Sequence, residues 1–219
     1  MKFITMMSLT FLSLLPIINP VGMSSSFLGL TKHLSPQERH FTAYKVAVYS
    51  FILLSCVLFF GKIVLEFFGL TLPFIRIAGG LLVSFTGWGM LTSKSKLSQE
   101  EKFELKTNKG DDLAFFPLTL PLTAGAGAIA ITVSIALGIP SVQPDSELIQ
   151  LYSGAVVGIL GNAILVAICY RCCDFIFLKI GKTGVIVITS LSAFILVALG
   201  FSVMWNGIIS LIIIAKHIN

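Results

Sequence analysis

The stretch Leu15-Pro16-Ile17-Ile18-Asn19-Pro20-Val21-Gly22 places two prolines and a glycine inside an otherwise apolar segment. A second stretch of this kind, Phe116-Pro117-Leu118-Thr119-Leu120-Pro121-Leu122-Thr123-Ala124-Gly125-Ala126-Gly127, occurs early in the second half of the chain. Proline removes a backbone N–H donor and frees the carbonyl four residues earlier, so each stretch is predicted to break a helix. Non-helical backbone at membrane depth is tolerated only where protein buries it or where it lines a polar cavity. Breaks in corresponding places of two halves therefore point to a transporter's binding site.

The composition is typical of a polytopic membrane protein. Of the 219 residues, 56% are hydrophobic and only 11% are charged, and the mean hydropathy is +0.97. A soluble domain carries about 25% charged residues. The net charge of +5 comes from basic residues spread over short loops, so no nucleic-acid partner is expected. The lipid bilayer is the expected environment of most of the chain.

Six segments are long and apolar enough to cross a bilayer, which takes about 20 residues each. We expect an all-α membrane protein in which the first and fourth of six transmembrane helices are broken. Between the first two spans, Ser35-Pro36-Gln37-Glu38 is a capping box with proline at the first helical position, which predicts a helix start. The predicted spans are residues 3–30, 42–64, 70–93, 112–139, 148–171 and 183–215.

The two halves of the chain look like repeats. Span three opens with Gly69-Leu70-Thr71-Leu72 and span six with Gly181-Lys182-Thr183-Gly184, and each half begins with a broken span. Because three spans per half is an odd number, the second half is expected to be inverted relative to the first. The predicted organisation is a three-helix repeat over 1–93, a charged cytoplasmic loop over 94–111 and a second three-helix repeat over 112–219.

Lysine and arginine predict the orientation in the membrane. Most of them lie in the first, third and fifth loops, and the third loop alone contains a lysine-rich run within 94–109. Cytoplasmic loops carry the excess of positive charge, so these three loops are predicted to be cytoplasmic. Both termini are then on the periplasmic side.

The two breaks offer polar groups to a small ligand. Free N–H groups and the positive end of a restarted helix attract a carboxylate, while freed carbonyls and Asn19 suit an ammonium group or Na⁺. Ser24-Ser25-Ser26 would cap the half-helix after the first break, and a second half-helix is expected from about Ala128. The hydroxyl of Thr123 binds either substrate or its own backbone. The predicted substrate-binding residues are Asn19, Pro20, Gly22, Ser24, Pro121, Thr123, Gly125 and Gly127.

Catalytic and metal-binding motifs are missing from the sequence. It contains no P-loop, no GxSxG and no HExxH, and no Asp or Glu lies clearly in the middle of a predicted span. We therefore expect neither an enzyme nor an ATP-driven pump, and no metal or cofactor. The sequence leaves open whether Na⁺ or H⁺ is the coupling ion. Cys169-Tyr170-Arg171-Cys172 contains a CxxC without a partner motif, which indicates packing at a helix end.

Three motifs in this chain resemble those of the MarC family of bacterial inner-membrane proteins. They are Asn19-Pro20-Val21-Gly22, the run FGLTLPFIRIAGG over 68–80 and the run over 112–127. The resemblance implies a six-span protein of the LysE-like transporter superfamily, some relatives of which are described as neutral amino-acid transporters. The chain departs from the family at Gly125-Ala126-Gly127, where Gly-Pro-Gly is usual, and at Thr189-Ser190-Leu191-Ser192, where a charged pair is usual. Structural or gating roles are expected for Arg76, Gly79, Gly80 and Asp112.

Two hypotheses follow for the function. The first is a secondary transporter or exporter of small neutral amino acids or similar metabolites in the bacterial inner membrane, working by rocking one repeat against the other. The second is a membrane sensor or binding protein of the same family that performs no net transport. Glycine-rich faces on spans three and five allow a homodimer.

Overall fold

The computed structural model describes residues 2–92, 113–140 and 144–218, and these residues form helices and short connections without any strand. The expectation of an all-α protein is confirmed. The predicted charged loop over 94–111 and the candidate residue Asp112 lie outside the described residues.

The first broken segment consists of helices α1 (Lys2–Ile18) and α2 (Pro20–Leu30), which are bent by 43° relative to each other. Asn19 stands between them in the left-handed conformation, with φ 42° and ψ 58°. Asparagine tolerates this region better than most residues because its short side chain bonds to nearby backbone. The break lies at the position that the sequence predicts.

The cap of α2 differs from the sequence expectation. Asn19, not the serine run, caps the helix, because its Oδ1 accepts a hydrogen bond from the Gly22 N–H at 3.2 Å. Proline at the first helical position needs no N–H partner and is already set to a helical φ. Ser24 and Ser25 lie inside α2, where their hydroxyls donate to the carbonyls of Val21 and Gly22.

The second broken segment consists of η2 (Ala114–Thr123), a wide-turned irregular helix, and α6 (Ala126–Gly138), bent by 67° relative to η2. Phe116 and Leu120, each followed by a proline, have extended backbone with φ of −126° and −113°. A residue before proline is pushed towards this region by the proline ring. The new helix begins two residues earlier than predicted, at Ala126.

The other helices are α3 (Pro36–Phe67), α4 (Leu72–Thr92), α7 (Asp145–Arg171) and α8 (Cys173–Ile218). By length and composition, four helical stretches could cross a membrane: Pro36–Leu65, Leu72–Thr92, Asp145–Arg171 and Thr183–Lys216. The number rises to six if each bent pair is one span. The predicted capping box at the start of α3 is confirmed, since Ser35 and Glu38 exchange hydrogen bonds.

Two glycines turn the chain with nearly the same φ. Gly69, between α3 and α4, has φ 68°, and Gly181, inside α8, has φ 70°. Glycine is the one residue that enters this region without a steric penalty. Gly181 divides α8 into a short first part and the long stretch Thr183–Lys216.

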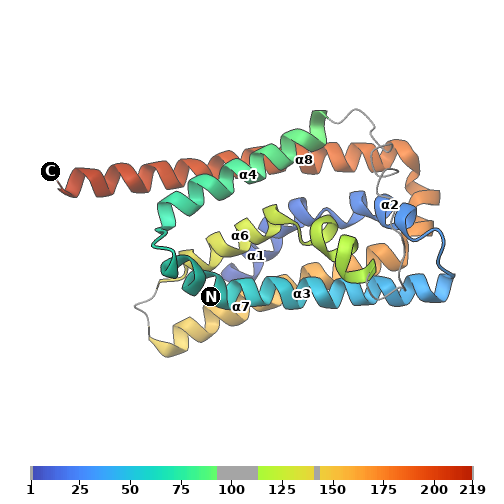
Figure 1. Ribbon diagram of the computed structural model, residues 1–219, viewed down its shortest axis with the longest axis horizontal. Coiled ribbons are helices and arrows are strands. Elements are labelled where there is room, and N and C mark those ends of the chain that lie inside the picture. Colours follow the sequence, from blue (N-terminus) through green and yellow to red (C-terminus); the bar gives the residue numbers. More distant parts are fainter. Residues whose placement is uncertain (1, 93–112, 141–143, 219) are drawn as a thin grey trace.

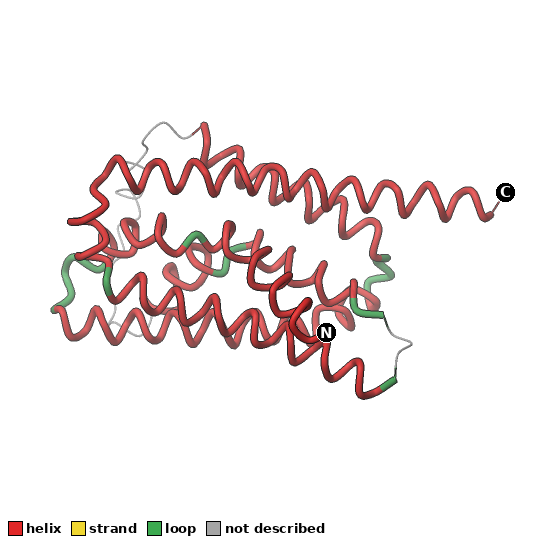
Figure 2. Tube along the Cα trace, turned by 180° about the vertical axis from the view of Figure 1, so that it is seen from behind, coloured by secondary structure: helices red, strands yellow, loops and turns green. Residues whose placement is uncertain are grey.

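The helices are arranged in layers (Figures 1 and 2). The helices α4 and α8 lie along each other on one side, α3 and α7 lie on the other, and the broken segments run between them. The most extensive contacts join α4 to α8, α1 to α7 and α3 to α7, so they all link the first half of the chain to the second. The two halves are therefore interleaved.

Glycine allows close approach at two of these helix pairs. A Cβ built on Gly80 of α4 would lie 2.5 Å from the Gly200 carbonyl oxygen and 2.6 Å from the Met204 nitrogen, both on α8. A Cβ on Gly158 of α7 would lie 2.7 Å from the Met7 carbonyl oxygen of α1. Small residues let helix backbones touch where lipid supplies no hydrophobic drive for association.

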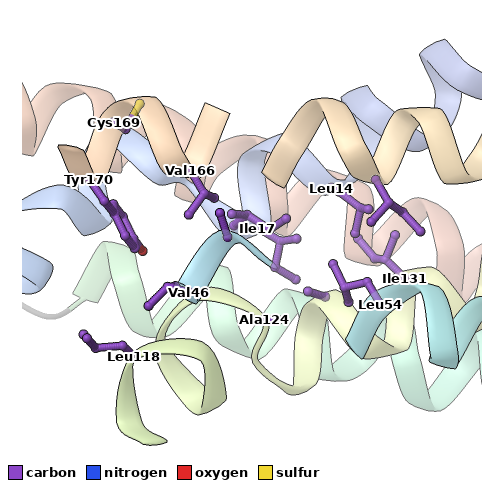
Figure 3. Packing of buried hydrophobic residues seen from close by; sticks show 14 of the residues in the cluster. Leu14, Ile17, Val46, Leu54, Leu118, Ala124, Ile131, Val166, Cys169 and Tyr170 are labelled. Atoms are coloured by element: carbon purple, nitrogen blue, oxygen red, sulfur yellow. The ribbon is translucent and has the colours of Figure 1, made fainter. Parts of the chain in front are cut away.

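The buried core surrounds the two breaks (Figure 3). Leu14 and Ile17 precede the first break and Ala124 lies in the second, and all three belong to one cluster with side chains of α3 and α7. Large apolar side chains elsewhere, such as Phe74 and Trp205, are exposed as expected for surfaces that face lipid. The first break itself, at Ile18, Asn19 and Pro20, is thus buried inside protein, as irregular backbone in a membrane requires.

Candidate functional site

A buried polar cluster lies where the first break meets α8. Asn19 is 2% exposed, and its Oδ1 accepts hydrogen bonds from the Gly22 N–H and, at 3.4 Å, from the Ser192 hydroxyl. Its Nδ2 has no hydrogen-bond partner in the described part of the chain. Leaving a buried donor unpaired costs about 1–3 kcal/mol. Each such group in a native structure calls for an explanation, and a ligand or ordered solvent is one.

Gly22 lets α8 approach this asparagine. A Cβ built on Gly22 would overlap the Asn19 amide and would lie 2.5 Å from the Thr189 Oγ1. Glycine is therefore required at this position for Thr189 to approach the break. We call Asn19, Gly22, Thr189 and Ser192 the Asn19 cluster.

Sequence reasoning did not place Thr189 and Ser192 in the site. It treated their stretch only as a departure from the family pattern. A signal was available, because hydroxyl residues three positions apart lie on one face of a helix. That spacing shows which residues share a face, but it does not show which other helix the face meets.

The start of α2 adds a favourable electrostatic field to the Asn19 cluster. Helix N-termini carry partial positive charge, and α2 is 11 residues long. The unpaired Nδ2 of Asn19 lies beside this terminus, since the same side chain caps it. Amide, hydroxyl and helix dipole together form a site that suits a carboxylate.

The second break lies next to the first. A Cβ on Gly127 would overlap the Ile17 side chain, two residues before Asn19. A Cβ on Gly125 would lie 2.6 Å from the Pro121 carbonyl oxygen, so this glycine permits a tight turn within the break itself. Pro121 is exposed. Gly127 of the second break thus contacts the first broken segment, whereas Pro121 is at the surface.

The hydroxyl of Thr123 is engaged in structure. Its Oγ1 lies 2.7 Å from the Leu118 carbonyl oxygen and 2.9 Å from the Tyr170 hydroxyl of α7. Thr119 likewise donates to the Ala114 carbonyl at 2.7 Å. Tyr170 also stacks on Phe27 of α2, with ring centroids 4.5 Å apart. Thr123 therefore ties the second break to α7 and, through Tyr170, to α2.

Replacing Tyr170 with phenylalanine should lower stability modestly. The stacking on Phe27 is kept while the hydrogen bond to Thr123 is lost, and such a bond contributes about 1 kcal/mol. Thermal unfolding in detergent measures the effect. Tyr152→Phe is the matched control, because Tyr152 stacks on Phe59 and its hydroxyl makes no hydrogen bond to any residue that the structure describes. Equal unfolding temperatures for the two variants would contradict the role of the Thr123 bond.

The remaining candidates lie around the Asn19 cluster or away from it. Pro20 and Ser24 are buried in α2. Gly79 of α4 packs against α6, since its Cβ would lie 3.4 Å from the Ala130 Cβ. Arg76, one turn before Gly79 on α4, is half-buried near Gly138. The described residues contain no group of three His, Cys, Asp or Glu side chains that could hold a metal ion.

The two best-formed surface hollows in the described part of the chain do not reach the Asn19 cluster. One is lined by Lys2, Met6 and Leu151, and the other by His40, Tyr44 and Arg171. Neither includes a residue of the cluster. The cluster is therefore closed off from both of these hollows.

The family model and the similar proteins that match this chain all point to the same family. Residues 4–212 match the family model described as MarC family integral membrane protein. Inner membrane protein MarC of Salmonella typhimurium is 31% identical over 204 residues, which covers 91% of this chain and 92% of that protein. The protein of the same name from Escherichia coli strain UTI89 is 32% identical over the same shares of both chains. No solved structure matches the chain. Because the match extends over nearly the whole length of the chain, this chain belongs to the MarC family of integral membrane proteins.

Proposed function

We propose that this protein is a secondary transporter or exporter of small neutral amino acids, or of similar small metabolites, in the bacterial inner membrane. The observation that carries the proposal is the buried and unpaired Nδ2 of Asn19 at the start of α2. The location follows from the similar proteins, whose names describe them as inner membrane proteins.

The chemistry of the Asn19 cluster suits a small zwitterion. The substrate carboxylate would accept from Nδ2 and lie at the positive end of α2. The ammonium group would donate to the Asn19 Oδ1 and to the hydroxyls of Thr189 and Ser192. The recorded hydrogen bonds of Asn19 involve no charged side chain, which favours a substrate without net charge. The overlap that a Cβ on Gly22 would produce indicates a confined site and a small substrate.

Inverted repeats would supply the two-sided access that transport needs. If the halves are repeats, α2 corresponds to α6 and α8 corresponds to α4. The contact of α2 with α8 then corresponds to the contact of α6 with α4, and both contacts are present. Gly69 likewise corresponds to Gly181, and their φ values are 68° and 70°. These observations support the inverted-repeat plan in which the site lies near the midplane of the bilayer. The positive charge of the odd-numbered loops supports periplasmic termini.

Reconstitution of the purified protein into liposomes tests the proposal. Labelled glycine and alanine should enter saturably, and the rate should rise with either an imposed Na⁺ gradient or an imposed pH gradient. Protein-free liposomes give the background. Binding of the labelled amino acid to folded protein without uptake under any gradient would overturn transport and support the sensor alternative. Absence of both binding and uptake would overturn the substrate class.

A further inference from the structure

An ion pair closes one end of the helix bundle. Arg39 of α3 lies with its Nη1 3.1 Å and 2.9 Å from the two carboxylate oxygens of Asp174 on α8. The Arg39 side chain is only 13% exposed, whereas that of Asp174 is 59% exposed. The two residues are 135 positions apart and come from different halves of the chain. The pair thus connects two helices that are far apart in the sequence.

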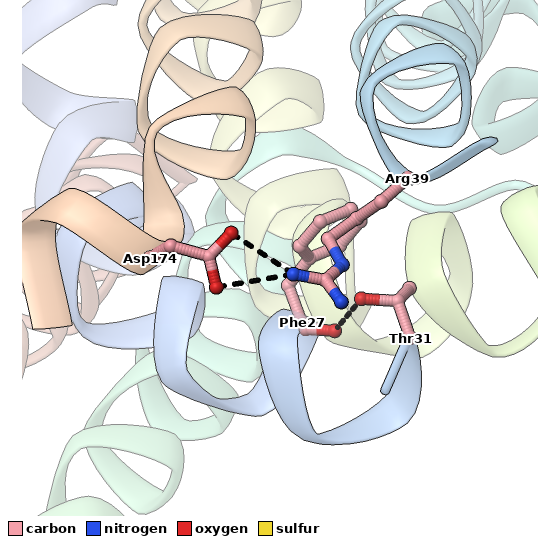
Figure 4. A network of polar contacts seen from close by, with 4 residues as sticks. All are labelled: Phe27, Thr31, Arg39 and Asp174. Carbon is pink, nitrogen blue, oxygen red and sulfur yellow. Dashed lines mark hydrogen bonds and ion pairs between the residues drawn. The ribbon is translucent and has the colours of Figure 1, made fainter. Parts of the chain in front are cut away.

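The guanidinium of Arg39 lies over the end of α2 (Figure 4). Beside it are Phe27, which is fully buried, and Thr31, whose hydroxyl donates to the Phe27 carbonyl at 2.7 Å. Phe27 stacks on Tyr170, which bonds to Thr123 of the second break. The aromatic pair therefore forms a layer between the ion pair and the Asn19 cluster. At 1.5 Å per helical residue, Thr31 is about 18 Å along α2 from Asn19.

Asp174 sits on a segment that the backbone separates from the rest of α8. Cys172, just before α8, has non-helical angles of φ −97° and ψ 18°, and Gly181 has φ 70°. Hinges are a few residues at element ends that absorb changes in φ and ψ. The short stretch between these two points can tilt without bending the long apolar part of α8.

A second ion pair, whose side chains are 50% and 33% exposed, lies at the opposite end. Lys2 of α1 binds Glu147 of α7, again joining the two halves. Lys2 begins the first broken segment and Thr31 follows its last helical residue, so the two pairs lie at opposite ends of that segment. The Asn19 cluster lies between them.

We propose that the Arg39–Asp174 pair is the gate of the Asn19 site at one membrane face and that Lys2–Glu147 is the gate at the other. This inference rests on the proposed function, because a transporter must open its site to each face in turn. In the structure both pairs are formed, Asn19 and Gly22 are buried, and Thr189 and Ser192 are half-buried. Loss of Asp174 would leave the buried Arg39 charge without its partner, and hydration of that charge favours the open state.

Cysteine accessibility tests the gates without any substrate. The four native cysteines are replaced by alanine, and Ser24→Cys serves as the reporter, since Ser24 is 2% exposed and lies between Asn19 and Phe27. The impermeant reagent MTSET is applied to vesicles of either orientation. Asp174→Asn should raise the labelling rate on the order of tenfold from the face that carries Arg39. The double variant Arg39→Asp/Asp174→Arg carries the same ion pair with its charges exchanged. Its labelling should be as slow as that of the protein with both native residues.

Lys2→Gln is the matched control at the opposite end. It should raise labelling from the Lys2 face and leave labelling from the Arg39 face unchanged. Size-exclusion profiles establish that each variant is folded. Unchanged labelling in Asp174→Asn, or equal increases from both faces, would overturn the gate. Face-specific labelling in a protein that shows no uptake in liposomes would support the gates and overturn transport.

Discussion

Asn19→Ala is expected to lower glycine transport by about a hundredfold or more while the protein remains folded. The variant removes the donor and the acceptor that the substrate would meet. Hydrogen bonds to charged groups contribute about 1.5–3 kcal/mol each, and 1.4 kcal/mol corresponds to a factor of ten, so loss of two reaches this range. The measurement is the initial rate of labelled glycine uptake into liposomes at equal protein content.

One further variant separates the role of the Asn19 amide from that of the backbone at this position. Asn19 has φ 42°, which alanine adopts with strain and glycine adopts freely. Asn19→Gly should therefore be as inactive as Asn19→Ala while being better folded. Asn206→Ala is the matched control, because Asn206 is an exposed residue of α8, and it should transport normally. Wild-type uptake in Asn19→Gly would show that the side chain does not bind substrate.

Gly80→Leu is expected to prevent folding. Even a Cβ at this position would lie 2.5 Å from the Gly200 carbonyl oxygen and 2.6 Å from the Met204 nitrogen. Both atoms belong to the α8 backbone, so no side-chain rotation can relieve the overlap. The helices α4 and α8 would have to separate along their shared contact, which is the most extensive in the protein. Overpacking usually costs about 1–3 kcal/mol, and a leucine against backbone exceeds that range.

Gly89→Leu provides the control on the same helix. Apart from its chain neighbours and the backbone of its own helix, no atom of the described residues lies within 4 Å of a Cβ built on Gly89, and this residue is exposed. Thermal unfolding in detergent and the size-exclusion profile should be close to wild type for Gly89→Leu. Gly80→Ala should unfold at a lower temperature but remain folded, and Gly80→Leu should yield only aggregated protein. A monodisperse Gly80→Leu with normal uptake would refute the tight crossing.

The breaks in the two broken segments could be predicted because proline and glycine act on the backbone around them. Pro20 removes a helical donor wherever its helix lies, and the extended conformations of Phe116 and Leu120 follow from the prolines after them. The capping box at Ser35 is equally local, since its partner Glu38 is three residues away. The sequence also places Gly69 at the opening of the third predicted span and Gly181 at the opening of the sixth.

The role of each polar side chain at the breaks could not be predicted in the same way. Thr123 has two hydrogen-bond partners, and one of them, Tyr170, is 47 positions away. Ser24 was expected to cap a helix, but Asn19 already satisfies that terminus, so the serine lies one turn further in. The roles of these residues depend on competition among neighbours.

Local chemistry in the sequence therefore determined the helices, their breaks and their apolar outer faces, because these depend on backbone donors, side-chain shape and the absence of charge. The tertiary structure alone decided that Ser192 meets Asn19, that Thr189 lies against Gly22, and that Arg39 meets Asp174 across 135 positions. These contacts depend on which helix faces pack together. In lipid that choice is made by close backbone approach at residues such as Gly22 and Gly80, and hydropathy does not encode it.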